Sequence, residues 1–78
     1  MRLTLYTRPG CHLCEEIKAL LSRLKTRQAF MLTEIDISSS PTLQLLYQDH
    51  IPVLLLDGEE VARHRVSEAE LLRLLQKH

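Results

Sequence analysis

The two cysteines of this chain constrain its fold and chemistry more than any other feature. They are Cys11 and Cys14, the only cysteines in the sequence, and they directly follow Pro9 and Gly10. One turn of helix brings side chains at this spacing together, so a single local element can close the two thiols into a disulfide and open them again. Such reversible closure is typical of redox chemistry.

A single Cys-x-x-Cys pair also indicates the cellular compartment in which the protein works. Small secreted scaffolds usually carry several disulfides at scattered spacings, whereas one isolated pair in a cytoplasmic chain is redox-active or binds a metal. Residues 1–8 alternate instead of forming the apolar stretch of a secretion signal. No apolar run approaches the roughly 18 to 20 residues that a membrane span requires. We therefore expect a cytoplasmic protein that does not enter a membrane.

Length and charge limit the classes of protein to which the chain can belong. Its 78 residues suffice for one domain, 1–78, and a 45% hydrophobic content is enough for a compact core. Ten basic and ten acidic side chains cancel, so no net field attracts the chain to a nucleic acid backbone. We expect a small globular monomer without a nucleic acid partner.

The first half of the chain predicts a strand, a helix and a second strand. Residues 3–7 alternate apolar and polar and end before a turn signal, which indicates a short strand. Apolar residues then recur at helical spacing and predict an amphipathic helix over about 11–26, with Cys14 on its buried stripe. The segment 30–37 is apolar and β-branched, so it predicts a strand. Residues that would share one face of that strand are Met31, Thr33, Ile35 and Ile37.

The second half predicts a helix, a hairpin and a final helix. Ser40 can cap a short helix that has Pro41 at its first position and ends near His50. Side chains expected to be buried by this helix are Leu43, Leu46 and Tyr47. Residues 53–56 are continuously apolar, which indicates a central strand covered on both faces. Asp57-Gly58 is a strong hairpin signal, so residues 60–64 should return antiparallel as a charged edge strand.

The chain ends in a third predicted helix. Ser67 and Glu70 form a capping box ahead of four leucines in residues 71–75. The order of elements is therefore strand, helix, strand, helix, strand, strand, helix. A right-handed crossover makes the first two strands parallel, and the hairpin adds an antiparallel edge. These elements predict an α/β fold with a mixed sheet.

Two motifs of this chain resemble the thioredoxin superfamily, and specifically its small glutaredoxin-like proteins. The first is Tyr-Thr-Arg-Pro-Gly-Cys-His-Leu-Cys at residues 6–14, and the second is Ile-Pro-Val-Leu-Leu-Leu-Asp-Gly at residues 51–58. The resemblance spans nearly the whole chain. It implies a thioredoxin-like β-α-β-α-β-β-α fold, with a four-stranded mixed sheet flanked by three helices. It also implies that Pro52 has a cis peptide bond and faces the dithiol.

The chain departs from ordinary glutaredoxins at three places. Ordinary glutaredoxins have Cys-Pro-Tyr-Cys, whereas this chain has His12 and Leu13 between its cysteines. They have Thr-Val-Pro where this chain has His-Ile-Pro at residues 50–52. The Gly-Gly pair with which they hold the glutathione carboxylate is missing from residues 62–65. Arg8 does match the basic residue that they place before Pro-Gly-Cys. The resemblance therefore implies an oxidoreductase, and leaves either glutathione or a reductase as its electron donor.

We expect Cys11 to attack a substrate disulfide and Cys14 to resolve the mixed disulfide from the buried stripe. A free cysteine has a pKa near about 8.5 and is mostly protonated at neutral pH. The positive end of a helix favours the thiolate at its N-terminus, and Arg8 and His12 add positive potential. The expected substrate is a disulfide-containing protein or a small thiol. Residues predicted to bind it are Arg8, His12, Ile51 and Pro52, with the backbone of Ile51 free to pair with a peptide or with glutathione.

Two other functions remain open at this stage. The cysteines and His12 or His50 could ligate zinc, but a structural zinc site needs four ligands and the chain has no second Cys-x-x-Cys. Two chains could instead share an iron–sulfur cluster with glutathione, as some glutaredoxins do. The protein could also be a non-catalytic adaptor whose surface around Pro52 binds a peptide by strand-like pairing. We expect an oxidoreductase without a resident cofactor or metal.

Overall fold

The computed structural model describes residues 1–76, so the last two residues of the predicted domain lie outside the described range. Its elements are β1 (Arg2–Thr7), α1 (His12–Leu24), β2 (Met31–Asp36), the 3-10 turn η1 (Ile37–Ser39), α2 (Pro41–Tyr47), β3 (Val53–Leu56), β4 (Glu59–Arg63) and α3 (Glu68–Gln76). The predicted order is confirmed, and η1 is the one element that the sequence analysis did not include. No helix within residues 1–76 is long and apolar enough to cross a membrane.

The four strands form one mixed sheet in the order β2-β1-β3-β4. β1 runs parallel to β2, while β3 is antiparallel to both β1 and β4. The predicted four-stranded mixed sheet with three helices is thus confirmed. β3 occupies an inner position, and Val53, Leu54 and Leu56 are almost completely buried, as its continuous apolar sequence predicted.

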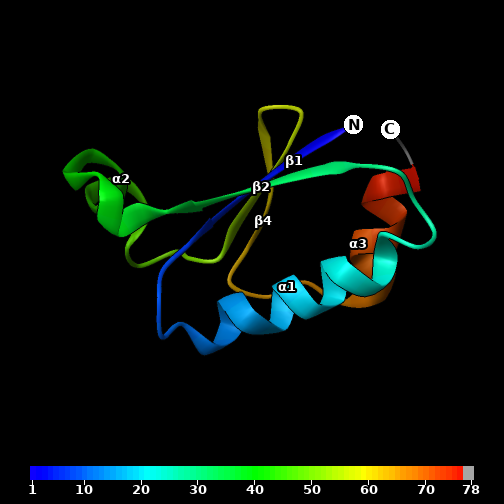
Figure 1. Cartoon of the computed structure of the whole chain (residues 1–78), viewed down its shortest axis with the longest axis horizontal. Helices are drawn as coiled ribbons and strands as arrows, with labels where there is room; N and C mark the ends of the chain where they lie inside the picture. The colour runs from blue at the N-terminus through cyan, green and yellow to red at the C-terminus, as the bar shows by residue number, and fades with distance from the viewer. Residues whose placement is uncertain (77–78) are drawn as a thin grey trace.

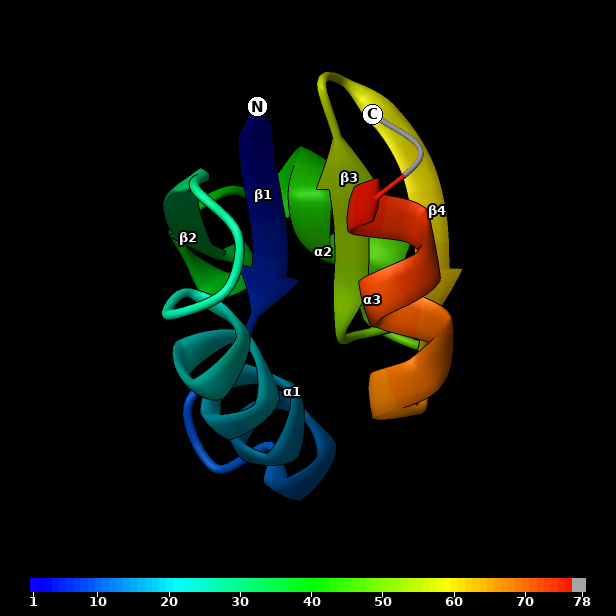
Figure 2. The same cartoon turned by 90° about the vertical axis from the view of Figure 1, so that its right-hand side faces the viewer.

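The helices lie on different sides of the sheet. α1 and α3 lie below it in Figure 1, whereas α2 lies at the end of the molecule away from α3. Figure 2 views the molecule from the α3 end and shows α3 in front of the strands and α2 behind them. The main core forms between the strands and the helices α1 and α3. Its fully buried members include Leu3, Leu5, Leu21, Leu54 and Leu71.

Local signals account for the ends of several elements. At the start of α3 the Glu70 N–H donates to the Ser67 hydroxyl at 3.1 Å, and the Ser67 N–H donates to the Glu70 carboxylate at 3.3 Å. The predicted capping box is therefore confirmed. In the β3–β4 hairpin Asp57 and Gly58 both have positive φ, at 49° and 88°, which is the backbone that a two-residue type I′ turn requires.

The predicted second strand is one residue too long at each end. Ile37 leaves the sheet and starts η1, because the Asp36 carboxylate accepts hydrogen bonds from the N–H and the hydroxyl of Ser38. These bonds lower the pKa of Asp36 below its ordinary value. Met31 and Thr33, which share the predicted face, are exposed because β2 is an edge strand, while Ile37 is fully buried.

The predicted burial of Leu46 is wrong, since this side chain is 55% exposed. α2 has only seven residues and lies at one end of the sheet, so a single side of it meets the rest of the protein. Leu43 and Tyr47, four positions apart, occupy that side and are partly buried. Leu45 is more exposed still, at 78%.

We expect Leu54→Ala to lower the free energy of unfolding by roughly 2 to 5 kcal/mol, because it opens a cavity at a side chain in the centre of the core. The matched control is Leu45→Ala, which removes the same atoms from the surface and should cost less than about 0.5 kcal/mol. Urea denaturation followed by circular dichroism measures both changes. Equal losses in the two variants would contradict the core described above.

Candidate redox-active site

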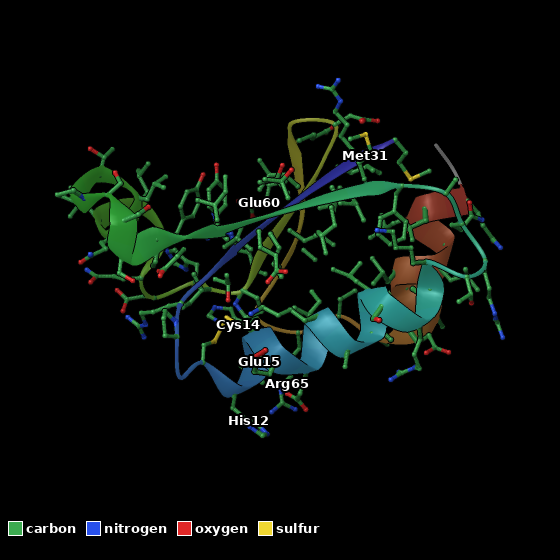
Figure 3. All side chains as sticks on the ribbon, viewed as in Figure 1. His12, Cys14, Glu15, Met31, Glu60 and Arg65 are labelled. Carbon is green, nitrogen blue, oxygen red and sulfur yellow. A yellow bond between two sulfur atoms is a disulfide. The ribbon has the colours of Figure 1, made fainter. Side chains whose placement is uncertain are left out.

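The two cysteines form a disulfide at the start of α1. Cys11 is the N-cap residue of the helix and Cys14 lies in its first turn, with their Cα atoms 5.2 Å apart. Figure 3 shows the two sulfurs bonded at this end of the helix. The Cys14 N–H donates to the Cys11 Sγ at 3.2 Å. A charge on the Cys11 sulfur would therefore meet both a backbone donor and the positive end of the helix.

The turn before the helix depends on a glycine. Gly10 has a φ of 78°, a left-handed backbone conformation that residues with a Cβ atom rarely adopt. The turn is closed by the Cys11 N–H, which donates to the Arg8 carbonyl at 3.3 Å. The chain thereby reverses direction between β1 and α1 and places the disulfide at the end of β1.

The two cysteines differ in their access to solvent. Cys14 is 0% exposed, whereas Cys11 is partly exposed. A substrate can therefore reach the sulfur of Cys11 first. This difference is what the helical periodicity predicted when it placed Cys14 on the buried stripe.

Residues from four further segments surround the disulfide. Cys14 packs with the buried side chains of Ile37 and Ile51 in a small cluster that is separate from the main core. Partly buried neighbours of this cluster are Tyr6, Cys11, Leu43 and Tyr47. The sequence analysis did not assign these tyrosines, Leu43 or Ile37 to the site. The one sequence signal that any of them belongs to the site is that Tyr6 lies within the first motif.

The two tyrosines that pack on this cluster form a stacked pair. The ring centroids of Tyr6 and Tyr47 are 4.5 Å apart, and the ring planes differ by 15°. Tyr6 belongs to β1 and Tyr47 is the last residue of α2, so this contact ties α2 to the sheet. Both rings remain partly exposed.

The loop before β3 closes the other side of the site. The Ile51–Pro52 peptide bond is cis, as the resemblance implied. Both residues are buried, and the Pro52 carbonyl accepts a hydrogen bond from the His64 N–H at 2.8 Å. The expectation of a free backbone at Ile51 is only partly right. Its N–H donates to the Tyr47 carbonyl at 3.1 Å, so this donor is already paired.

Arg8 and His12, the other predicted binding residues, are exposed. In Figure 3 His12 points away from the sheet at the start of α1. Neither side chain forms an ion pair within residues 1–76. The structure thus gathers Ile51 and the two cysteines into one cluster and leaves Arg8 and His12 at its rim. His50 packs edge to face on His64, with ring centroids 6.1 Å apart.

Acidic side chains in the first turns of α1 oppose a thiolate at Cys11. Lys18 binds Glu15 at 3.4 Å and Glu34 at 3.1 Å. These contacts, the hydrogen bond to Glu34 above all, raise the pKa of Lys18, so its ammonium group stays charged. The positive charge of Lys18 offsets part of the negative potential of Glu15 near the dithiol.

A shallow groove of about 320 Å³ begins at Leu13, between the two cysteines, and runs along α1. Its floor is apolar and includes Ile17 and Leu20, while Glu16 and Arg65 belong to its charged rim. The far end contains an ion pair between Arg23 and Glu68 at 3.1 Å. Within residues 1–76, no three His, Cys, Asp or Glu side chains lie close enough together to hold a metal ion.

Comparisons with known proteins agree with this fold. The family model described as "Glutaredoxin-like domain (DUF836)" matches residues 2–76. An uncharacterized protein of Mycobacterium tuberculosis is 33% identical over 75 residues, which cover 90% of this chain and 77% of that protein. The solution structure of protein Ne2328 from Nitrosomonas europaea has a TM-score of 0.79 and 34% identity, and the match covers 95% of this chain and 89% of that one. A mutant thioredoxin from Halobacterium salinarum shares the fold, with a TM-score of 0.68 and 23% identity over 97% of this chain and 72% of that one.

After reduction, we expect iodoacetamide to label Cys11 at least about tenfold faster than Cys14, because only Cys11 combines exposure with a stabilised thiolate. Mass spectrometry of peptides from a timed labelling reaction measures the two rates. In guanidinium chloride both cysteines should react at similar rates, which controls for their intrinsic reactivity. Equal rates in the folded protein would show that the two thiols do not differ in access.

Proposed function

Because the chain belongs to the glutaredoxin-like family that this domain model defines, we propose that it is a thiol–disulfide oxidoreductase that reduces or exchanges disulfides. The observation that supports this proposal best is the asymmetric cysteine pair. A partly exposed Cys11 caps α1, and a fully buried Cys14 lies one turn behind it and is joined to it by a disulfide. This arrangement suits one sulfur for attack and the other for resolution.

In the first step the Cys11 thiolate attacks one sulfur of a substrate disulfide. A new bond forms between Cys11 and that sulfur, the substrate disulfide breaks, and the departing sulfur leaves as a thiolate that takes up a proton from water. The Cys14 N–H, which donates to the Cys11 Sγ, favours the thiolate form of the attacking group. The exposed guanidinium of Arg8 adds positive potential at the rim of the site.

In the second step Cys14 loses its proton and attacks the sulfur of Cys11. The mixed disulfide breaks, the second substrate thiol is released, and the protein is left with the Cys11–Cys14 disulfide. Two electrons have then passed from the protein dithiol to the substrate. A thiol donor, glutathione or the dithiol of a reductase, must return two electrons and two protons before the next cycle.

We assign substrate binding to groups that border the dithiol. The Ile51 carbonyl can accept a hydrogen bond from an extended peptide, and the adjacent cis Pro52 shapes that edge of the site. Arg8 and His12 provide positive charge for an anionic group of the substrate. The partner is a disulfide-containing protein or a small thiol. We place the protein in the cytoplasm, where thiols are kept reduced, as a monomer without nucleic acid or membrane partners.

A Cys14→Ser variant should accumulate a mixed disulfide through Cys11, because the buried group that resolves it has been removed. Incubation with a disulfide substrate followed by non-reducing mass spectrometry detects the adduct. The matched variant Cys11→Ser should form no adduct and should lose turnover. If Cys11→Ser keeps full activity, Cys11 is not the attacking group.

A coupled turnover assay should show that a thioredoxin-reductase-type donor supports faster turnover than glutathione. The physical reason is that residues 62–65 lack the Gly-Gly pair that holds the glutathione carboxylate in ordinary glutaredoxins. Arg63, in this segment, is paired with Glu60. Faster turnover with glutathione would contradict this expectation and identify glutathione as the electron donor. Absence of dithiol-dependent turnover with either donor would favour the adaptor function instead.

A further inference from the structure

The groove along α1 is a part of the surface that the reaction steps above do not use. It has a volume of about 320 Å³ and begins at Leu13, the residue directly before Cys14. Ile17 and Leu20 are buried and form its floor, while Leu13 and Val66 are partly exposed and add apolar surface to its lining. An apolar hollow that starts between the two cysteines is a place where part of a substrate can bind.

The side of the groove opposite α1 is formed by the loop between β4 and α3. This loop starts at His64, which has a φ of 59° and turns the chain in a left-handed conformation. The His64 N–H donates to the Pro52 carbonyl at 2.8 Å, and the Arg65 N–H donates to the Arg63 carbonyl at 2.6 Å. His64, Arg65 and Val66 all line the groove. The groove and the cis-proline loop are therefore joined through one segment of backbone.

An ion pair spans the end of the groove that is far from the cysteines. Arg23 of α1 binds Glu68 of α3 at 3.1 Å, and both side chains line the groove. They also line a second pocket at the C-terminal end of α1, so the pair separates the two spaces.

The end of the groove beside the dithiol is not spanned in this way. Glu16 and Arg65 line the same groove, but neither forms an ion pair within residues 1–76. In Figure 3 Arg65 lies at the end of α1 that carries Cys14. A chain can therefore enter the groove from the dithiol end, and it meets one negative and one positive side chain there.

The length of the groove suits a short extended segment. Leu13 and Arg23 are ten positions apart on α1, which corresponds to about 15 Å along the helix axis. An extended chain rises about 3.3 Å per residue, so about four residues span this distance. Alternate side chains of such a chain point in opposite directions. One apolar side chain can thus enter the groove while its neighbours remain near the charged side chains of Glu16 and Arg65.

We propose that this groove binds the segment of a substrate protein that adjoins the cysteine under attack. The preferred segment is extended and has a large apolar side chain within about four residues of that cysteine, with an acidic and a basic residue beside it. The apolar side chain supplies most of the binding free energy, because its burial contributes more than an exposed ion pair does. The charges of Arg65 and Glu16 add selectivity. This inference rests on the proposed function, since it assigns the surface that selects substrates for the same dithiol.

The test measures how fast the Cys14→Ser variant captures peptides of defined sequence. Each peptide has one cysteine that is linked by a disulfide to thionitrobenzoate. The Cys11 thiolate bonds to the peptide sulfur and releases thionitrobenzoate, whose colour gives the rate. The reference peptide has a leucine between a glutamate and a lysine, placed before the cysteine in one series and after it in another. Matched peptides have serine in place of the leucine, or glutamine in place of both charged residues.

In at least one series, we expect the reference peptide to be captured about tenfold faster than the serine peptide and about threefold faster than the glutamine peptide. The charge effect should be lost when Arg65→Glu is added, and should persist with Arg73→Glu, a reversal at an exposed residue of α3 outside the groove. The leucine effect should fall with Val66→Ser and persist with Val61→Ser, because Val61 lies on β4 outside the groove. Equal rates for all peptides in both series would overturn the proposal, and so would equal losses in the groove variants and their controls.

A small substrate separates this proposal from the function on which it rests. Hydroxyethyl disulfide is uncharged and too small to reach along the groove, so it should modify Cys11 at similar rates in all of these variants. If it reacts and the peptides are not discriminated, the dithiol is active and only the groove proposal fails. The peptide comparison decides this even if Val66→Ser does not fold.

Binding can also be measured without any reaction at the dithiol. If no disulfide modifies Cys11, the proposed function fails, and the groove is tested by NMR titration with the reference peptide carrying serine in place of cysteine. Shifts at the amides of Leu20 and Val66 that disappear in Arg65→Glu and persist in Arg73→Glu would support the groove as a peptide site. Absence of these shifts in the unaltered protein would overturn the proposal.

Discussion

The packing of α1 against β1 is the interaction on which the rest of the structure depends. A turn that contains Gly10 in a left-handed conformation reverses the chain, and the buried stripe of the helix then covers the buried face of the strand. The same turn delivers Cys11 to the helix N-terminus and Cys14 to the stripe. The contact that closes the core therefore also separates the two sulfurs into an accessible one and a buried one.

The site itself forms where regular structure ends. β1 ends at Thr7, β2 gives way to η1, and the cis Pro52 loop leads into β3. Side chains from these ends form a small apolar cluster around Cys14 that is distinct from the main core. Loops can present groups to a substrate because they are not committed to sheet hydrogen bonds. At Ile51 the N–H is not free for such a contact, since it donates to the Tyr47 carbonyl.

Elements with a strong local signal could be predicted from the sequence. The hairpin at Asp57-Gly58, the capping box at Ser67 and the amphipathic α1 each depend on residues within one or two turns of each other. The end of β2 also depends on a local interaction, the bonds between Asp36 and Ser38, which the assignment of the strand to residue 37 did not take into account. The exposure of Leu46 could not be predicted in this way, because it depends on the position of α2 at one end of the sheet.

The sequence by itself determined the order of the elements, the spacing of the dithiol and the burial of Cys14, because periodicity and turn chemistry are local properties of the chain. Only the tertiary structure decided which distant groups surround that dithiol. It stacked Tyr6 on Tyr47 and left the Thr7 hydroxyl without a hydrogen-bond partner among residues 1–76. These outcomes follow from sheet register and helix placement, which join residues dozens of positions apart and which no local pattern specifies.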